Sequence, residues 1–138
     1  MKKVLFACIM MMCCCSVKAQ VIKDSSYAML GIVEKDGTIK DRSYFMKGKI
    51  ERDGTLRDRT FQMVGKIESD GTIKDRSFSI VGYVYKDGSV RSRDFAIIGY
   101  VDDHGQVKDK NFSYIGYAEG VNRELAAVLF FFNLISLK

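Results

Sequence analysis

The fold is decided by the stretch Ser77-Phe78-Ser79-Ile80-Val81-Gly82-Tyr83-Val84-Tyr85-Lys86-Asp87-Gly88-Ser89-Val90-Arg91. A period of two predicts a strand with one inner set of side chains, namely Phe78, Ile80, Gly82 and Val84. The other face then carries Ser79, Val81, Tyr83 and Tyr85. Asp-Gly predicts a tight turn, because glycine accepts the positive φ that such a turn needs. A shorter strand follows, so the stretch predicts a β-hairpin.

This pattern recurs every 17 residues. One glycine series, here called the strand glycines, falls inside the long strands: Gly31, Gly48, Gly65, Gly82, Gly99 and Gly116. A second series, the turn glycines, follows each Asp or His: Gly37, Gly54, Gly71, Gly88 and Gly105. An aromatic residue recurs at Tyr27, Tyr44, Phe61, Phe78, Phe95 and Phe112. Each unit therefore reads as a long strand, an Asp-Gly turn, a short strand and a polar corner such as Lys74-Asp75-Arg76.

Glycine within a strand marks a bulge or a close backbone approach. Six strands with a small residue at one height can crowd around a common axis, with the larger Phe, Ile and Met side chains filling the wider part of the interior. The sequence therefore predicts a mainly β protein, a closed radial array of β-hairpins. The half units at residues 20–30 and 116–120 complement each other and favour closure, which removes sheet edges. A β-solenoid with one repeat per coil is the alternative.

The first residues are typical of a cleavable secretory signal. Two lysines precede an apolar stretch, and Val17-Lys18-Ala19 places the expected cut between Ala19 and Gln20. We therefore divide the chain into a signal peptide at 1–19, a repeat domain at 20–120 and an apolar segment at 121–138. A lipoprotein is the less favoured reading of the cysteines in this leader.

Cleavage changes the overall chemistry. It removes all four cysteines and leaves 19 basic against 17 acidic residues, a net charge of +2 in place of +5. The exported chain, periplasmic or extracellular, is then free of disulfides, and its near-neutral charge argues against nucleic acid as a partner.

The last segment breaks the repeat. Asn122 is a candidate N-cap, Glu124 falls in the first turn, and residues 125–137 are apolar on nearly all sides. We expect a short helix that packs on the repeat domain as a plug or lid. Association of copies through 125–137 and contact with a membrane surface are the alternatives, and the three Phe residues are also compatible with a strand.

Candidate chemistry is sparse. His104, the sole histidine, stands where other units have a turn aspartate, so we expect neither a metal site nor a catalytic triad there. The repeated carboxylates share equivalent environments, whereas a glycosidase needs two different ones. We read them as solvated charges paired with nearby lysines and arginines. The sequence therefore predicts no catalytic residue, no metal and no cofactor.

The best candidate for binding is where one outer position becomes aromatic, at Tyr83, Tyr100 and Tyr117, with Tyr85 on the same face. Tyrosines on neighbouring strands can stack on sugar rings or anchor a protein. The other reading is that they cover the sheet beneath the apolar segment.

The units with the pattern Gly-x-Ile-x-x-Asp-Gly-x-Ile-Lys-Asp-Arg-Ser-Phe resemble those of the bacterial secreted β-flower proteins, in particular the five-fold type. The resemblance covers residues 20–120 and implies a signal peptide and a radial β-hairpin fold. It implies no catalytic residues.

From the sequence we expect a secreted, non-catalytic binding or structural module whose partner is a carbohydrate or a protein at the cell surface. A glycan-acting hydrolase that uses the ring carboxylates, or a component that self-assembles through its apolar segment, is the alternative.

Overall fold

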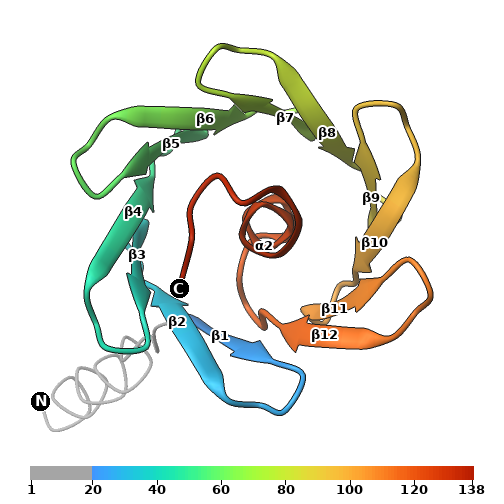
Figure 1. Cartoon of the computed structure of the whole chain (residues 1–138), viewed down its shortest axis with the longest axis horizontal. Coiled ribbons are helices and arrows are strands. Elements are labelled where there is room, and N and C mark those ends of the chain that lie inside the picture. Colours follow the sequence, from blue (N-terminus) through green and yellow to red (C-terminus); the bar gives the residue numbers. More distant parts are fainter. Residues whose placement is uncertain (1–19) are drawn as a thin grey trace, which may run out of the picture.

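The computed structural model describes residues 20–138, which form a closed ring of twelve strands around a central segment (Figure 1). The signal peptide expected at 1–19 lies outside the described residues. The strands are β1 (Gln20–Asp24), β2 (Met29–Val33), β3 (Thr38–Asp41), β4 (Met46–Ile50), β5 (Thr55–Asp58), β6 (Met63–Ile67), β7 (Thr72–Asp75), β8 (Ile80–Val84), β9 (Ser89–Ser92), β10 (Ile97–Val101), β11 (Gln106–Asp109) and β12 (Tyr114–Tyr117).

Each strand is antiparallel to both neighbours, and β1 pairs with β12 to close the ring. In that last pair Lys23 lies opposite Tyr117 and Asp24 opposite Gly116. No strand of the ring is left with a free edge. The predicted closed array of β-hairpins is therefore confirmed, and the solenoid alternative is excluded.

Two kinds of turn alternate around the ring. The Asp-Gly turns lie between a long strand and the next short one, as expected, and their glycines have φ between 80° and 94°. The polar corner expected after each short strand is a second tight turn, which we call the outer loop. Six outer loops project from the ring, as Figure 1 shows, so the ring contains six outward hairpins joined by five Asp-Gly turns.

An aspartate holds five of the six outer loops together, and Ser92 stands at this position in the sixth. At the start of an outer loop, Asp75 Oδ1 accepts hydrogen bonds from the backbone N–H groups of Ser77 (2.8 Å) and Ser79 (3.0 Å). The same pair of bonds forms at Asp24, Asp41, Asp58 and Asp109. These carboxylates therefore do more than pair with neighbouring cations, because they also replace backbone acceptors in the turn.

The expected alternation fails before each strand glycine because a β-bulge intervenes. Gly82 lies opposite Ile73 but Ile80 lies opposite Lys74, so Val81 is the extra residue. Val81 packs against the core, whereas Ile80 is 37% exposed. The placement of Phe78 and its equivalents inside the ring was therefore wrong.

The core is built from both strands of each unit. The short strands contribute one fully buried side chain each, namely Ile22, Ile39, Leu56, Ile73, Val90 and Val107. The long strands contribute residues two positions beyond each strand glycine, such as Val84 and Val101.

The apolar segment enters the centre of the ring. It begins with α2 (Arg123–Ala127), whose N-cap Asn122 accepts a hydrogen bond from the backbone N–H of Leu125, as predicted. One π-helical turn, η1 (Val128–Phe132), continues it, and Asn133 in the left-handed conformation ends it. The predicted short helix is confirmed, but its expected extent to Leu137 was wrong. No helix within residues 20–138 has the length and apolar character to cross a bilayer.

Each strand glycine faces a different side chain of this segment. In order around the ring the pairs are Gly116 with Phe130, Gly99 with Phe131, Gly82 with Phe132, Gly65 with Leu134, Gly48 with Ile135 and Gly31 with Leu137. Successive units are one-sixth of a turn apart. A π-helix turns through a smaller angle per residue than an α-helix, so successive Phe side chains can face successive units of the ring.

The structure thus assigns the apolar segment to the interior of its own ring rather than to a contact between copies. Leu125, Ala126, Ala127, Val128 and Ile135 are buried there. Lys47 adds a polar contact at the end of the segment, because its Nζ donates to the backbone oxygen of Lys138 at 3.1 Å.

Candidate binding site on the outer wall

The aromatic residue of every outer loop is exposed and adopts an unusual backbone conformation. Tyr27, Tyr44, Phe61, Phe78, Phe95 and Phe112 have φ between 62° and 68° and are 54–63% exposed. Asparagine and glycine are the residues that favour this left-handed region, and bulky side chains are disfavoured there. Six aromatic residues therefore occupy positions that turn geometry alone would give to other residue types.

In half of the ring these residues stack on the outward tyrosines. Tyr83 stacks on Phe95 with ring centroids 4.7 Å apart, and Tyr100 stacks on Phe112 at 4.5 Å. Tyr117 stacks on Tyr27 at 4.3 Å across the junction of β12 and β1. We call these three pairs, together with Tyr85 and Tyr114, the aromatic flank.

The aromatic flank brings together all four tyrosines singled out from the sequence. Tyr83, Tyr100 and Tyr117 lie on successive long strands, and Tyr85 lies edge-on to Tyr83 with centroids 6.5 Å apart. They do not lie beneath the apolar segment, because that segment is inside the ring and they face outward. In the other half of the ring, the same position is occupied by Ile32, Lys49 and Lys66.

Sequence reasoning missed the partners in these stacks. Tyr83 and Phe95 lie in adjacent units, 12 residues apart, and the other two pairs repeat that spacing once the ring is closed. The 12-residue spacing was visible in the sequence. It brings two rings into contact only because the bulge turns the outer-loop aromatic residue outward.

Three cations lie over rings of the aromatic flank. The guanidinium of Arg91 is 4.7 Å from the Tyr85 centroid, Lys108 Nζ is 5.0 Å from that of Tyr114, and Lys23 Nζ is 5.7 Å from that of Tyr27. These distances are within the range of cation–π attraction. The flank therefore combines apolar ring faces with positive charge.

A cleft borders the flank at the ring junction. It encloses about 630 Å³ and is lined by Lys23, Tyr27, Tyr117 and Glu119, together with Gln20, Val21, His104, Gln106 and Gly120. Five junctions between units are bridged by an Asp-Gly turn, whereas at this one the chain leaves for the centre of the ring after Gly120. The cleft places His104 near the flank.

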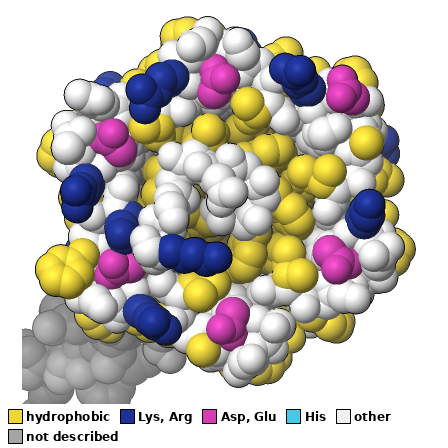
Figure 2. All heavy atoms as spheres, viewed as in Figure 1, with side chains coloured by type: hydrophobic (Ala, Val, Ile, Leu, Met, Phe, Trp, Pro, Cys, Tyr) yellow, Lys and Arg dark blue, Asp and Glu magenta, His cyan; other side chains and the backbone are white. Residues whose placement is uncertain are grey.

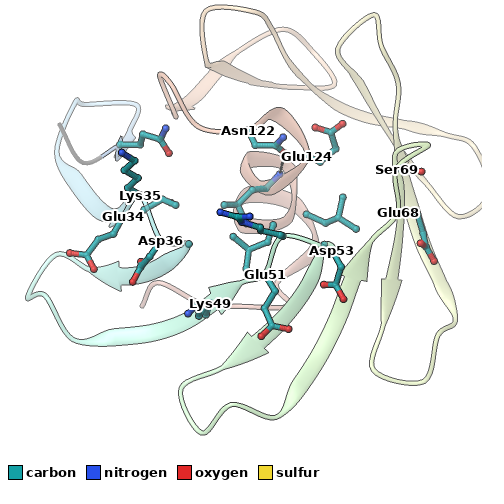
Figure 3. Close-up of a pocket in the computed structure, with 18 residues that line it drawn as sticks. Glu34, Lys35, Asp36, Lys49, Glu51, Asp53, Glu68, Ser69, Asn122 and Glu124 are labelled. Carbon is teal, nitrogen blue, oxygen red and sulfur yellow. Dashed lines mark hydrogen bonds between the residues drawn. The ribbon is translucent and has the colours of Figure 1, made fainter. Parts of the chain in front are cut away.

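A larger cavity of about 870 Å³ lies where the first three Asp-Gly turns meet the start of α2 (Figure 3). Glu34, Glu51, Glu68 and Glu124 line it, with Asp36, Asp53, Lys35, Lys49 and Arg52. Figure 2 shows basic and acidic side chains alternating around one face of the ring, with hydrophobic side chains nearer the centre.

The pKa values of the carboxylates in the Asp-Gly turns are shifted in the opposite direction from that of a general acid. The pKa values of Asp36, Asp53, Asp70 and Asp87 are lowered, chiefly because each accepts a hydrogen bond from the backbone N–H two residues later. A glycosidase acid needs a raised pKa. The tuning of these groups therefore gives no support to the hydrolase alternative.

The fifth turn, where His104 replaces aspartate, is held differently. Asp102 accepts hydrogen bonds from the backbone N–H groups of His104 and Gln106, both at 2.9 Å. Within residues 20–138, no group of three or more His, Cys, Asp and Glu side chains gathers closely enough to hold a metal ion.

Comparison with known proteins gives one match. The family model described as "5-fold beta-flower protein" matches residues 19–134. No curated protein and no solved structure matches the chain. The ring described above has six outward hairpins and five Asp-Gly turns.

Proposed function

The chain belongs to the 5-fold β-flower family, and from this membership and the geometry of its outer wall we propose that it is an exported, non-catalytic module whose aromatic flank binds a saccharide chain. The observation that carries the proposal is the row of three stacked aromatic pairs on successive hairpins. The apolar face of a pyranose ring packs well on an aromatic face, and an oligosaccharide presents such faces at regular intervals.

The strained outer loops support this assignment. A bulky residue in the left-handed region is costly, and such residues cluster at ligand contacts. These residues stay more than half exposed, while the apolar segment fills the interior of the β-sheet ring. Stacking on Tyr83, Tyr100 and Tyr117 holds three of them in fixed orientations, which lowers the entropy lost when a ligand binds.

The proposal is tested with protein that starts at Gln20. We expect it to bind saccharides on an array of neutral and acidic glycans, and a double Tyr83→Ala, Tyr100→Ala variant to lose at least tenfold in affinity for the bound glycan. The matched control is Lys49→Ala with Lys66→Ala, since these residues hold the same position in the other half of the ring.

Unchanged affinity in the tyrosine variant would reject the aromatic flank as the site. Binding to no glycan, combined with specific capture of a cell-surface protein, would replace the saccharide by a protein partner. Export is tested separately: intact mass spectrometry of the protein from its own cells should give a chain that begins at Gln20.

A further inference from the structure

We propose that the saccharide is acidic and that Lys23, Arg91 and Lys108 bind its carboxylate groups. This inference rests on the proposed function, and it adds the charge of the ligand. It comes from a difference between the two halves of the ring in how one series of cations is neutralised.

Every unit has a cation at the same place in its short strand, namely Lys23, Lys40, Arg57, Lys74, Arg91 and Lys108. Three of these pair with the glutamate six residues earlier. Lys40 lies 3.2 Å from Glu34, Arg57 lies 3.1 Å from Glu51, and Lys74 lies 3.0 Å from Glu68. In that half of the ring the series is already neutralised within the chain.

The other three cations have no such ion pair among the described residues. For Arg91 the glutamate is replaced by Tyr85. For Lys108 the equivalent residue is Asp102, whose Oδ1 accepts two backbone N–H groups instead. For Lys23 it is Glu119, which lines the same cleft without forming an ion pair with Lys23.

The contrast is sharpest between the two arginines. Each donates an Nη1 hydrogen bond to the carbonyl oxygen of the next outer-loop aromatic, Arg57 to Phe61 and Arg91 to Phe95. Arg57 Nε also meets Glu51, whereas Arg91 Nε is buried without an acceptor. Among residues 20–138, Arg91 therefore lacks the carboxylate partner that Arg57 has.

The cations without an ion pair belong to the same three consecutive units as the stacked pairs. Each lies over a ring of the aromatic flank, so aromatic faces and positive charges are interleaved there. A polymer of pyranose rings with a carboxylate on each unit matches both features, because its rings can stack while its carboxylates meet the cations. A neutral saccharide would leave the charges unused.

The test uses hexasaccharides of galacturonate, mannuronate and hyaluronan, each beside its methyl ester, which keeps the sugar and removes the charge. In calorimetric titrations at low salt we expect at least one acid to bind about tenfold more tightly than its ester. At about 0.5 M NaCl that preference should fall close to one, because salt screens exposed charges.

A triple variant locates the site. Lys23→Gln, Arg91→Gln and Lys108→Gln together should abolish the preference for the acid over its ester. The matched control is Lys40→Gln, Arg57→Gln and Lys74→Gln, which changes the same positions in the paired half and should keep the preference. Circular dichroism verifies that both variants retain the β-structure.

Equal affinity of every acid and its ester, or binding of none of the acids, overturns this inference. If affinity for a neutral glycan still depends on Tyr83 and Tyr100, the proposed function stands without it. An equal loss of preference in both triple variants would reject the assignment to these three cations.

Discussion

The ring of Phe131 lies against Gly99 where any larger residue would have its β-carbon. A methyl group there would overlap the phenyl ring and lie 2.7 Å from the carbonyl oxygen of Lys108. Five further glycine and side-chain pairs surround the apolar segment, so the strand backbone approaches this segment closely in every unit.

Gly99→Ala should destabilise the protein by about 1–3 kcal/mol, because the extra carbon forces the plug away from β10. The measurement is the free energy of unfolding in urea. Gly31→Ala should displace the apolar segment less, since the methyl groups of Leu137 lie at 3.1 and 3.4 Å and can rotate away, although its β-carbon would lie even closer to a carbonyl oxygen, that of Lys40. Equal losses would show that the backbone contact alone sets the cost.

The pairing of Phe131 with Gly99 predicts a coupling between the two positions. Phe131→Ala alone should lower the free energy of unfolding by about 2–3 kcal/mol, less than for a fully buried phenylalanine. In that background Gly99→Ala should cost at least about 0.5 kcal/mol less than in the native chain. Additive effects would mean that the glycine is required for another reason.

The outer loops predict opposite effects of the same substitution in the two halves. Phe78→Asn should stabilise the protein by about 0.5–1 kcal/mol, because asparagine tolerates the left-handed conformation better and no stacked tyrosine is lost. Phe95→Asn should not, since it also removes the stack on Tyr83, which is worth about 0.5–1.5 kcal/mol. Thermal unfolding compares them, and equal stabilisation would mean that the stack contributes nothing.

Acid should weaken the ring through the aspartates of the Asp-Gly turns. Folding lowers the pKa values of Asp36, Asp53, Asp70 and Asp87 below the ordinary 3.8. The unfolded chain therefore takes up protons first, and the stabilisation, complete above about pH 4, is lost as the pH falls through the folded values. Urea unfolding from about pH 6 to about pH 2 follows the loss.

The matched variant changes all four aspartates to asparagine, which still offers a side-chain oxygen to the backbone N–H groups. Its stability should vary less with pH over the same range. A slope as steep as that of the native chain would place the acid sensitivity at other carboxylates.

The repeat made much of the fold predictable. The spacing of Gly82 and Gly88 and of their equivalents was enough to predict the hairpin units, and the split end units indicated closure. The location of Phe78 could not be predicted from alternation, because the bulge at Val81 shifts the phase and no residue type announces it. The helix end at Asn133 was missed although the sequence carried a signal for it, because asparagine in the left-handed conformation commonly ends a helix.

The candidate site was predictable only in part. Tyr83, Tyr100 and Tyr117 were evident as a departure from Ile32, Lys49 and Lys66 in a regular series. Their partners Phe95, Phe112 and Tyr27 depend on how the chain joins across units. The unpaired state of Arg91 depends on side-chain geometry, although Tyr85 in place of glutamate was a visible sign of it.

The apolar segment also matches the number of units in the ring. Six side chains of this segment each contact one strand glycine, in order around the ring. An inserted unit would therefore leave a strand glycine without a side chain to contact, and a deleted unit would leave a side chain without its glycine. The number of units is thus encoded twice, once in the tandem repeats and once in the apolar segment that follows them. Expansion of the array by duplication would require a matching change in the terminal segment, which ties the evolution of the two parts together.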